Sequence, residues 1–349
     1  MPSAAVVLEI PGLDDEVRHV RISSPDRVMW PASGASKAVT KADLARYVVA
    51  VGDALLRAVG DRPVTLQRYP DGVQGQEFYS KNPPRGVPAW ARSVPVVYPS
   101  GRSHLQLVID EVATAVWTIQ MNTVTLHPWP VRTGNLDNPD ELRIDLDPQP
   151  GRPFSDVIEA ASALGELSRE LGFAPFVKTS GNRGLHVFSR IKPTHEFLEV
   201  RHGVIGVARE LERRKPELVT TAWWKEQRGD KIFIDFNQAC RDRTIASAYS
   251  VRPQPAAPVS MPVSWQQLPQ VKPADYTVWT VPEMLAADGD AWAPMDDAAG
   301  DVGAAIALWD MDIAERGLGE MNFPPDYPKM PNEPPRVQPS RKNAANWDN

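Results

Sequence analysis

Residues 141–151 read ELRIDLDPQPG, and this stretch decides which fold and site the chain is expected to have. Alternation along a β-strand puts Asp145 and Asp147 on one face and Ile144 and Leu146 on the other, and the prolines that follow end the strand. The two carboxylates then lie about 7 Å apart or less. Either the strand is an edge with one solvated face, or a cation lies between the carboxylates.

A third aspartate lies in another apolar strand. Residues 230–236 read DKIFIDF, and Asp235 is flanked there by apolar side chains. A lone buried charge is costly, so Asp235 needs either an arginine partner, with Arg241 and Arg243 as candidates, or a metal ion. If this strand lies beside residues 142–147, three carboxylates converge, and oxygen ligands without cysteine specify Mg²⁺ or Mn²⁺. Two such ions, about 3.5–4 Å apart, are the usual apparatus of in-line phosphoryl transfer.

The segment VKTSGNRGLHVF, residues 177–188, predicts two strands joined by a glycine-containing turn. Backbone N–H groups of such a turn can approach phosphate oxygens, and Lys178, Arg183 and His186 add positive charge or donors. A hairpin without a ligand explains the same pattern, and the P-loop and dinucleotide-binding spacings are both absent. His127, in TLHPW, is by itself best explained as a core residue. Beside His186 and the aspartates it becomes a candidate ligand of a triphosphate.

Basic and aromatic residues gather in three stretches near the N-terminus, SPDRVMWPASGASK (24–37), LQRYPDG (66–72) and QEFYSKNPP (76–84). A platform that stacks on nucleic-acid bases needs an exposed ring beside basic residues. Adjacent aromatics on a strand point to opposite faces, so one of the pair at 78–79 is ordinarily in the core. The candidate residues are Arg27, Lys37, Arg68, Phe78, Tyr79 and Lys81.

Composition describes a soluble globular chain of 349 residues, with 42% hydrophobic and 23% charged residues. Its single cysteine, Cys240, excludes an intramolecular disulfide and a cysteine-rich zinc site. No signal peptide or membrane span is found, so a cytoplasmic location is expected. The net charge of −6 is uneven, because residues 283–349 hold 13 acidic and 5 basic residues, against 31 and 33 in the rest. Net charge therefore does not exclude nucleic acid as a partner.

Periodicity and capping signals predict an α/β or α+β core. We expect a helix over 41–59 with Thr40 as N-cap and Asp43 completing a capping box, and another over 155–172 with Ser155 as N-cap and Gly172 as terminator. Further helices are expected near 110–121, 196–214 and 302–316, strands near 62–68, 123–127 and 230–236, loop over 80–104, and an extended tail after 331.

These segments together resemble the polymerase domain of bacterial ligase D, a branch of the archaeo-eukaryotic primase superfamily. The resemblance runs nearly colinearly from about Ile22 to Pro269, and its motifs stand in the family's order. They are SPDRVMWPASGASK, RPVTLQRYPDGVQGQEFYSKNPP, LRIDLDP, KTSGNRGLHVF, KIFIDF and RTIASAYSVRP.

The resemblance implies an α+β primase-polymerase fold. In that fold a central, mainly antiparallel sheet carries the acidic triad, helices flank it, and an N-terminal α/β layer precedes it. We expect residues 1–300 to form the catalytic domain, with the N-terminal layer over 1–110 and the core over 111–300. A C-terminal helix and extended tail follow over 301–349. Neither a K-x-D-G adenylation motif nor a histidine-rich phosphoesterase segment is found, so a stand-alone polymerase without ligase or nuclease domains is expected.

The function implied is that of a DNA repair polymerase. It adds nucleotides, ribonucleotides preferentially, to primer 3′ ends at gaps or double-strand breaks by a two-metal mechanism with Mn²⁺ or Mg²⁺. The implied partners are DNA ends with a 5′-phosphate, NTP or dNTP, Ku and a separate DNA ligase. The chain is expected to be a monomer associated with the bacterial nucleoid.

The resemblance also implies residue roles. Asp145, Asp147 and Asp235 match the metal-binding catalytic triad. Positions associated with the nucleotide triphosphate are matched by His127, Ser180, Arg183, His186 and Arg252. Arg27 and Lys37 match basic positions that recognise the 5′-phosphate, and Phe78 and Tyr79 an aromatic pair that stacks on template DNA.

The chain departs from the family at some of these positions. Arginine stands at 27 and 183 where lysine is frequent, and Phe78–Tyr79 replaces a Phe–Phe pair. Arginine keeps the charge but exchanges a point charge for a planar fork, so phosphate binding should survive while end preference changes. Two other functions use parts of the same pattern: a metal-dependent nuclease or phosphohydrolase, and a non-catalytic protein that bridges DNA ends.

Overall fold

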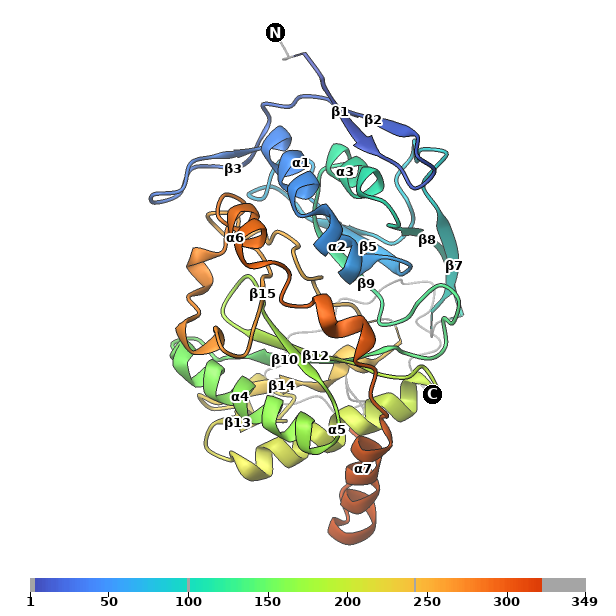
Figure 1. The fold of residues 1–349 in the computed structure, drawn as a ribbon. Helices are drawn as coiled ribbons and strands as arrows, with labels where there is room; N and C mark the ends of the chain where they lie inside the picture. The colour runs from blue at the N-terminus through green and yellow to red at the C-terminus, as the bar shows by residue number, and fades with distance from the viewer. Residues whose placement is uncertain (1–3, 99–100, 242, 322–349) are drawn as a thin grey trace, which may run out of the picture.

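The strand that carries Asp145 and Asp147 lies inside a six-stranded sheet of order β13-β14-β10-β12-β11-β15 (Figure 1). The computed structural model describes residues 4–98, 101–241 and 243–321. All pairs in this sheet are antiparallel except β13 with β14, which confirms the expected α+β class with a mainly antiparallel central sheet. Its strands are β10 (Glu141–Asp147), β11 (Pro175–Thr179), β12 (Leu185–Arg190), β13 (Val219–Thr220), β14 (Ile232–Asp235) and β15 (Pro262–Val263).

One face of this sheet is covered by two long helices, α4 (Phe154–Glu170) and α5 (Phe197–Arg214), which lie beneath it in Figure 1. The apolar phase of β10 points to them: Leu142, Ile144 and Leu146 are each 4% exposed or less. Burying a side chain of this size stabilises the fold by about 1.5–3 kcal/mol. The opposite phase, with Asp145 and Asp147, is left on the face away from the helices.

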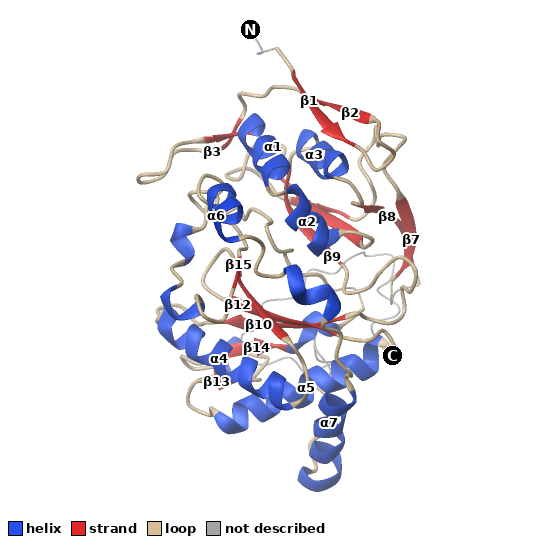
Figure 2. Cartoon of the chain, viewed as in Figure 1, coloured by secondary structure: helices blue, strands red, loops and turns tan. Residues whose placement is uncertain are grey.

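A second sheet of order β6-β5-β8-β7, with β9 also paired to β5, forms the other half of the fold. Figure 2 shows α1, α2 and α3 grouped together against this sheet. A hairpin of β1 and β2 and a short pair of β3 and β4 precede it. The strands are β1 (Val6–Pro11), β2 (Val17–Ile22), β3 (Val28–Trp30), β4 (Val39–Thr40), β5 (Pro63–Arg68), β6 (Phe78–Ser80), β7 (Ser93–Val97), β8 (Ser103–Val108) and β9 (Thr123–Pro128), and the helices are α1 (Lys41–Ala50), α2 (Gly52–Val59) and α3 (Val112–Gln120).

Arg143 joins the two sheets. Its guanidinium donates from Nη1 to the carbonyl oxygen of Pro128 at 2.7 Å and from Nη2 to that of Trp129 at 3.0 Å, both at the end of β9. Glu141 balances the charge, because its carboxylate accepts from Arg143 Nε at 2.8 Å. Arg143 is in the same phase of β10 as Asp145, so the acidic face of the first sheet looks toward β9.

The C-terminal part of the described chain contacts both halves of the fold, the β3–β4 loop through the segment around α6 (Val281–Asp288) and the helix α5 through α7 (Gly303–Arg316). Helix α7 packs along α5. Asp312 of α7 is fully buried and accepts hydrogen bonds from Arg213 and Arg316 at 2.9 and 2.8 Å. No helix within the described ranges is both long enough and apolar enough to cross a lipid bilayer.

Several local predictions are confirmed and others are wrong. The capping box of Thr40 and Asp43 is present, but the helix expected over 41–59 is broken at Val51 into α1 and α2. Gly172 ends its helix with φ +84, as expected. Ser155 is not an N-cap: α4 begins one residue earlier, and the Ser155 hydroxyl donates to Asp156 at 3.3 Å inside the first turn.

The stretch 80–104 was expected to be loop, and this is wrong for its last part. β7 runs over Ser93–Val97 and β8 begins at Ser103. β7 is an edge strand that contains Pro95, and proline is tolerated in a sheet only where its missing N–H is not needed. The prolines of this stretch therefore led to a loop prediction where the structure has an edge strand. The tail expected after residue 331 lies outside the described residues.

Candidate active site

Four neighbouring strands place a row of titratable side chains across the first sheet. Asp145 of β10 lies directly opposite His186 of β12 on one side and opposite Asp235 of β14 on the other. Lys178 of β11 in turn lies opposite His186. Directly opposed residues point to the same face of a sheet. The prediction that the two acidic strands are neighbours is confirmed, and we call Lys178, His186, Asp145 and Asp235 the active row.

The carboxylates of the row repel one another in a partly buried setting. Burial first, and then the charges of Asp235 and Asp147, raise the pKa of Asp145 to about 8. Burial also raises the pKa of Asp235. Asp147, the last residue of β10, adds a third carboxylate to this end of the sheet. Negative charge at this place is therefore unfavourable unless a cation compensates it.

Local donors hold the carboxylate of Asp235. Oδ1 accepts from the backbone N–H of Asn237 at 2.9 Å, and Oδ2 accepts from the Gln238 side-chain amide at 2.9 Å. Arg241, one of the two arginines considered as a structural partner, binds Asp137 at 2.7 Å instead. Arg243 acts on Asp235 only as a nearby charge that opposes the rise in its pKa.

The donor set of the three aspartates fits a hard divalent cation, since it consists of carboxylate oxygens without a thiol. Among the described residues, however, no group of three or more histidine, cysteine, aspartate or glutamate side chains is already gathered as a metal site. The oxygens of Asp235 are turned to Asn237 and Gln238, and Asp145 Oδ1 lies 3.4 Å from His186 Nε2. Binding would thus require the carboxylates to rotate, and the metal-ligand assignment stays a prediction.

The turn after β11 presses against both the acidic strand and Arg252. Ser180 Oγ accepts from the backbone N–H groups of Asn182 and Gly184 at 3.2 and 3.1 Å, which closes the turn. A Cβ on Gly184 would lie 2.4 Å from the carbonyl oxygen of Leu146. Gly181 has φ +69, and a Cβ there would lie 2.4 Å from Arg252 Cγ. Only glycines allow the turn to approach this closely.

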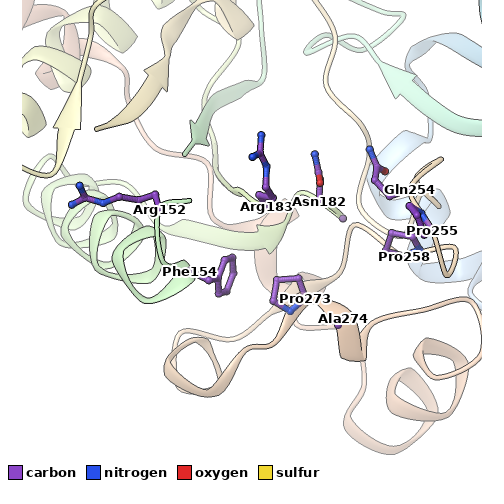
Figure 3. Close-up of a pocket in the computed structure, with 10 residues that line it drawn as sticks. Arg152, Phe154, Asn182, Arg183, Gln254, Pro255, Pro258, Pro273 and Ala274 are labelled. Carbon is purple, nitrogen blue, oxygen red and sulfur yellow. The ribbon is translucent and has the colours of Figure 1, made fainter. Parts of the chain in front are cut away.

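A cavity of about 400 Å³ opens beside this turn (Figure 3). Arg183, at the exposed tip of the turn, projects from it together with Asn182, and Phe154 and Pro273 lie on the other side of the opening. The cavity thus combines an aromatic ring and proline rings with a guanidinium. Its full lining is Arg152, Phe154, Gly181, Asn182, Arg183, Gln254, Pro255, Pro258, Pro273 and Ala274.

His127 enters the site from the second sheet. It lies on β9, is 7% exposed, and its Nε2 is 3.2 Å from Oε1 of Gln67. Its ring meets Tyr79 edge-on, with the centroids 5.6 Å apart. Burial, and then the charges of Arg252 and Lys178, lower its pKa to about 3. His127 is therefore a neutral hydrogen-bonding group and not a cation at neutral pH.

Arg252 supplies positive charge close to the row. Burial lowers its pKa, and the charge of Asp145 is the largest of the effects that oppose this shift. Arg183 and Arg252 thus lie on the outer and inner sides of the same turn, since Gly181 packs on Arg252 and Arg183 is exposed at the tip. The structure brings together the predicted residues His127, Ser180, His186, Arg252 and the aspartates.

The predicted DNA-contact residues lie around the second sheet and the β3–β4 loop, and Tyr79 among them borders the site through its contact with His127. Phe78 and Tyr79 are 41% and 51% exposed, so neither ring of this pair is in the core. Arg68 lies over the Phe78 ring at 4.8 Å and donates to the carbonyl oxygen of Met121 at 2.8 Å. Lys81 lies 4.0 Å from the centroid of the Tyr98 ring, and Arg27 donates to the carbonyl oxygen of Pro70.

Lys37 lines a second cavity, of about 660 Å³, which shares Ala274 with the first. The ammonium of Lys37 lies 3.8 Å from the centroid of the Trp279 ring, and Thr277 and Thr280 offer hydroxyl groups nearby. The predicted 5′-phosphate residue thus adjoins a cavity of its own.

Sequence reasoning missed four residues of these sites: Lys178 and Gln67 as partners of the two histidines, Gln238 as a donor to Asp235, and Trp279 beside Lys37. Two of them, Lys178 and Gln238, could have been found from a local sequence pattern. A hairpin centred on Asn182 pairs residue 178 with 186, and a glutamine three residues after a strand-end aspartate can reach back to it. Trp279 could not be found, because 242 positions separate it from Lys37.

Comparison with known proteins assigns this arrangement to a family. The model of the family described as LigD, primase-polymerase domain, matches residues 40–292. The multifunctional non-homologous end joining protein LigD of Pseudomonas aeruginosa is 34% identical over 278 residues, which are 78% of this chain and 32% of that protein. The bifunctional LigD of Bacillus subtilis is 30% identical over 252 residues, 72% of this chain and 40% of that protein. The chain spans about a third of the length of the curated relatives it matches.

A solved structure shares the fold. The polymerase domain of Mycobacterium tuberculosis ligase D, in complex with DNA, superposes with a TM-score of 0.74 at 28% identity, over 80% of this chain and 99% of that chain.

Proposed function

This chain belongs to the LigD primase-polymerase domain family, and from that premise we propose that it is a DNA-directed nucleotidyltransferase. It adds nucleotides, ribonucleotides preferentially, to primer 3′ ends at gaps or double-strand breaks. The observation that carries the proposal is the opposition of Asp145 to Asp235 and of Asp145 to His186 in one row. An acidic pair beside a phosphate-binding turn is what phosphoryl transfer requires.

Asp145, Asp147 and Asp235 would hold Mg²⁺ or Mn²⁺. When bound, the ions supply positive charge that activates a 3′-hydroxyl and stabilises the leaving pyrophosphate. Burial, together with the charges of Asp235 and Asp147, raises the pKa of Asp145 to about 8, and this cost of negative charge supports a cation at this place. The chain's own residues align the two reactants and exclude water between the two sheets.

The remaining residues of the site bind the triphosphate. His127 and His186 offer N–H donors from the second and the first sheet, and Ser180 offers a hydroxyl at the start of the turn. Arg183 and Arg252 contribute charge from the two sides of the turn. Since both histidines are buried and their pKa values are lowered, they act as neutral donors, and the arginines neutralise the phosphates.

DNA would be bound by the surface around the second sheet. The exposed rings of Phe78 and Tyr79 can stack on template bases, with Arg68 and Lys81 close to them. Lys37 and Arg27 would hold the 5′-phosphate of the downstream strand, with the cavity beside Lys37 and Trp279 as its place. The proposed protein partners are Ku and a DNA ligase, in keeping with the end-joining names of the relatives.

Primer extension tests the proposal. Wild-type protein, a labelled gapped primer–template, Mn²⁺ and each NTP or dNTP should give a longer primer, with NTPs used more efficiently. Asp145→Ala and Asp235→Ala should abolish extension while DNA binding persists. Shortening of the primer would identify a nuclease instead, and extension retained in either variant would contradict the catalytic assignment.

A further inference from the structure

We propose that Lys178 is a positioning residue, which fixes the imidazole of His186 so that the ring presents its Nε2–H toward Asp145 and the triphosphate site. The inference rests on the proposed function, because it assigns His186 a ligand, but the ring orientation can be measured independently of any activity.

Lys178 is a buried amine whose two hydrogen-bond partners among the described residues are neutral, and burial lowers its pKa well below the usual value. It is 0% exposed, and its Nζ lies 2.6 Å from Nδ1 of His186 and 2.6 Å from Oγ of Ser260. The Ser260 hydroxyl donates to the carbonyl oxygen of Thr179 at 2.7 Å, so its oxygen is free to accept from Lys178. Among the described residues, no carboxylate lies within 4 Å of the amine nitrogen.

A lysine that only filled space would be disfavoured at this position. Burying an unpaired ammonium costs several kcal/mol, and methionine has a similar length without that cost. The other buried lysine, Lys41 at the start of α1, is 4% exposed and has no contact with the active row among the described residues. The placement of Lys178 therefore calls for a role in its two polar contacts.

The contact with His186 determines the tautomer. In the proposed arrangement the Lys178 amine donates to Nδ1 of His186 as it donates to Oγ of Ser260, so Nδ1 carries its lone pair and the ring proton resides on Nε2. Nε2 lies 3.4 Å from Oδ1 of Asp145, so the second ring nitrogen faces the acidic end of the row. The cross-strand register places Lys178, His186 and Asp145 in line, so this orientation is built into the sheet.

Histidine-selective ¹⁵N NMR tests the inference directly. The chain has six histidines, and the signals of His186 are those lost in His186→Gln. In the wild type His186 should be the Nε2–H tautomer, with Nδ1 accepting a hydrogen bond. In Lys178→Met that hydrogen-bond signature should disappear and both tautomers should be seen, whereas Lys41→Met, the matched buried-lysine control, should leave His186 unchanged. A wild-type Nδ1–H tautomer, or an unchanged spectrum in Lys178→Met, would overturn the inference.

A double-mutant cycle on nucleotide affinity provides the second readout. Lys178→Met should weaken NTP binding about 10–100-fold, the range typical for partners that fix a functional histidine. Because Lys178 acts through His186, the double variant should bind no worse than His186→Gln alone. Losses that multiply would overturn the inference. If Lys178→Met fails to fold, Ser260→Ala takes its place, because removing that hydroxyl loosens Lys178 and should give a smaller shift in the same His186 signals.

The two proposals fail separately. If the wild type binds no nucleotide, the proposed function fails, while the tautomer of His186 still decides the role of Lys178.

Discussion

Asp145 lies directly opposite Asp235 on neighbouring antiparallel strands, although the two residues come from elements separated by a long helix, a hairpin and a second helix. Like charges in direct cross-strand opposition are destabilising. The fold places Asp147 at the same end of the sheet, which adds to the repulsion between the carboxylates. Such an arrangement is expected at a functional site where a bound cation offsets the repulsion between the carboxylates.

We therefore expect Asp145→Asn to stabilise the metal-free protein while abolishing activity. Because the pKa of Asp145 is raised to about 8, folding at neutral pH must either keep a repelled charge there or bind a proton, and an amide of the same size avoids both. The gain in the free energy of unfolding should be about 1 kcal/mol or more. In the wild type, Mn²⁺ at 100 times its Kd should add about 2.7 kcal/mol, and this increment should be absent from the variant. Thermal unfolding in EDTA and in MnCl₂ measures both effects.

The control for this experiment is Asp26→Asn, since Asp26 is an exposed aspartate outside the active row. It should leave the Mn²⁺ response unchanged. An equal Mn²⁺ response in Asp145→Asn would contradict the metal assignment.

Alternation along strands predicted the acidic face because it is a local property of the chain. The same local logic could have paired Lys178 with His186, since a hairpin's register follows from its turn. Pairing between distant strands is different, because no local signal states which strand lies beside which. The neighbourhood of Asp145 and Asp235 was a hypothesis until the structure confirmed it.

The predictions that were wrong, and the contact that was not predicted, also have physical reasons. Pro95 disguised an edge strand, because proline is excluded from central strands but allowed at an edge. Ser155 is a good capping residue by type, but the chain enters α4 one residue earlier through Pro153. The stacking of Lys37 on Trp279 depends on the packing of the C-terminal segment against the β3–β4 loop. Tertiary contacts of this kind have no periodicity that a sequence could reveal.

The buried His127 should make the protein sensitive to mild acid. Its pKa is lowered from 6.5 to about 3 in the native state, so below pH 6.5 the unfolded chain binds a proton that the native state does not. The stability that a neutral His127 contributes is therefore fully present above pH 6.5 and is lost as the pH falls toward 3. Relative to His127→Gln, the wild type should lose about 1.4 kcal/mol per pH unit over this range.

Urea unfolding of both proteins between pH 7 and pH 4.5 measures this difference. Comparison with His127→Gln isolates one group, since His186 and Asp145 titrate alike in both proteins. His19→Gln is the control because the His19 side chain is 61% exposed. A constant difference between wild type and His127→Gln across the range would show that His127 is not shielded from protons.

The exposed ring of Phe78 should bind template bases. Phe78→Ala should weaken affinity for a single-stranded template overhang by about 1–3 kcal/mol, the usual effect of losing one stacked base. Phe78 is the cleaner choice of the pair, because Tyr79 also packs against His127. Fluorescence anisotropy with blunt and overhanging duplexes measures the change, which should be confined to the overhang. Leu105→Ala removes an apolar side chain from β8 that is 50% exposed, more than Phe78, and should have no effect on either duplex.

Gly184 offers a test of how tightly the turn of residues 180–184, the proposed phosphate-binding turn, must approach the acidic strand. In Gly184→Ala the new Cβ would lie 2.4 Å from the backbone oxygen of Leu146, which cannot move aside as a side chain would. The turn must shift away from β10. The backbone N–H of residue 184, which donates to Ser180 Oγ, shifts with it. We expect a loss of about 1–3 kcal/mol in the free energy of unfolding.

NTP affinity should fall as well, because a displaced turn no longer aligns with His186. Gly134→Ala is the matched control: nothing lies within 4 Å of its added Cβ, so stability and affinity should be unchanged. If Gly184→Ala lost stability but kept full NTP affinity, the turn would be a structural hairpin, and the triphosphate site would have to be sought on the side of His127 and Arg252.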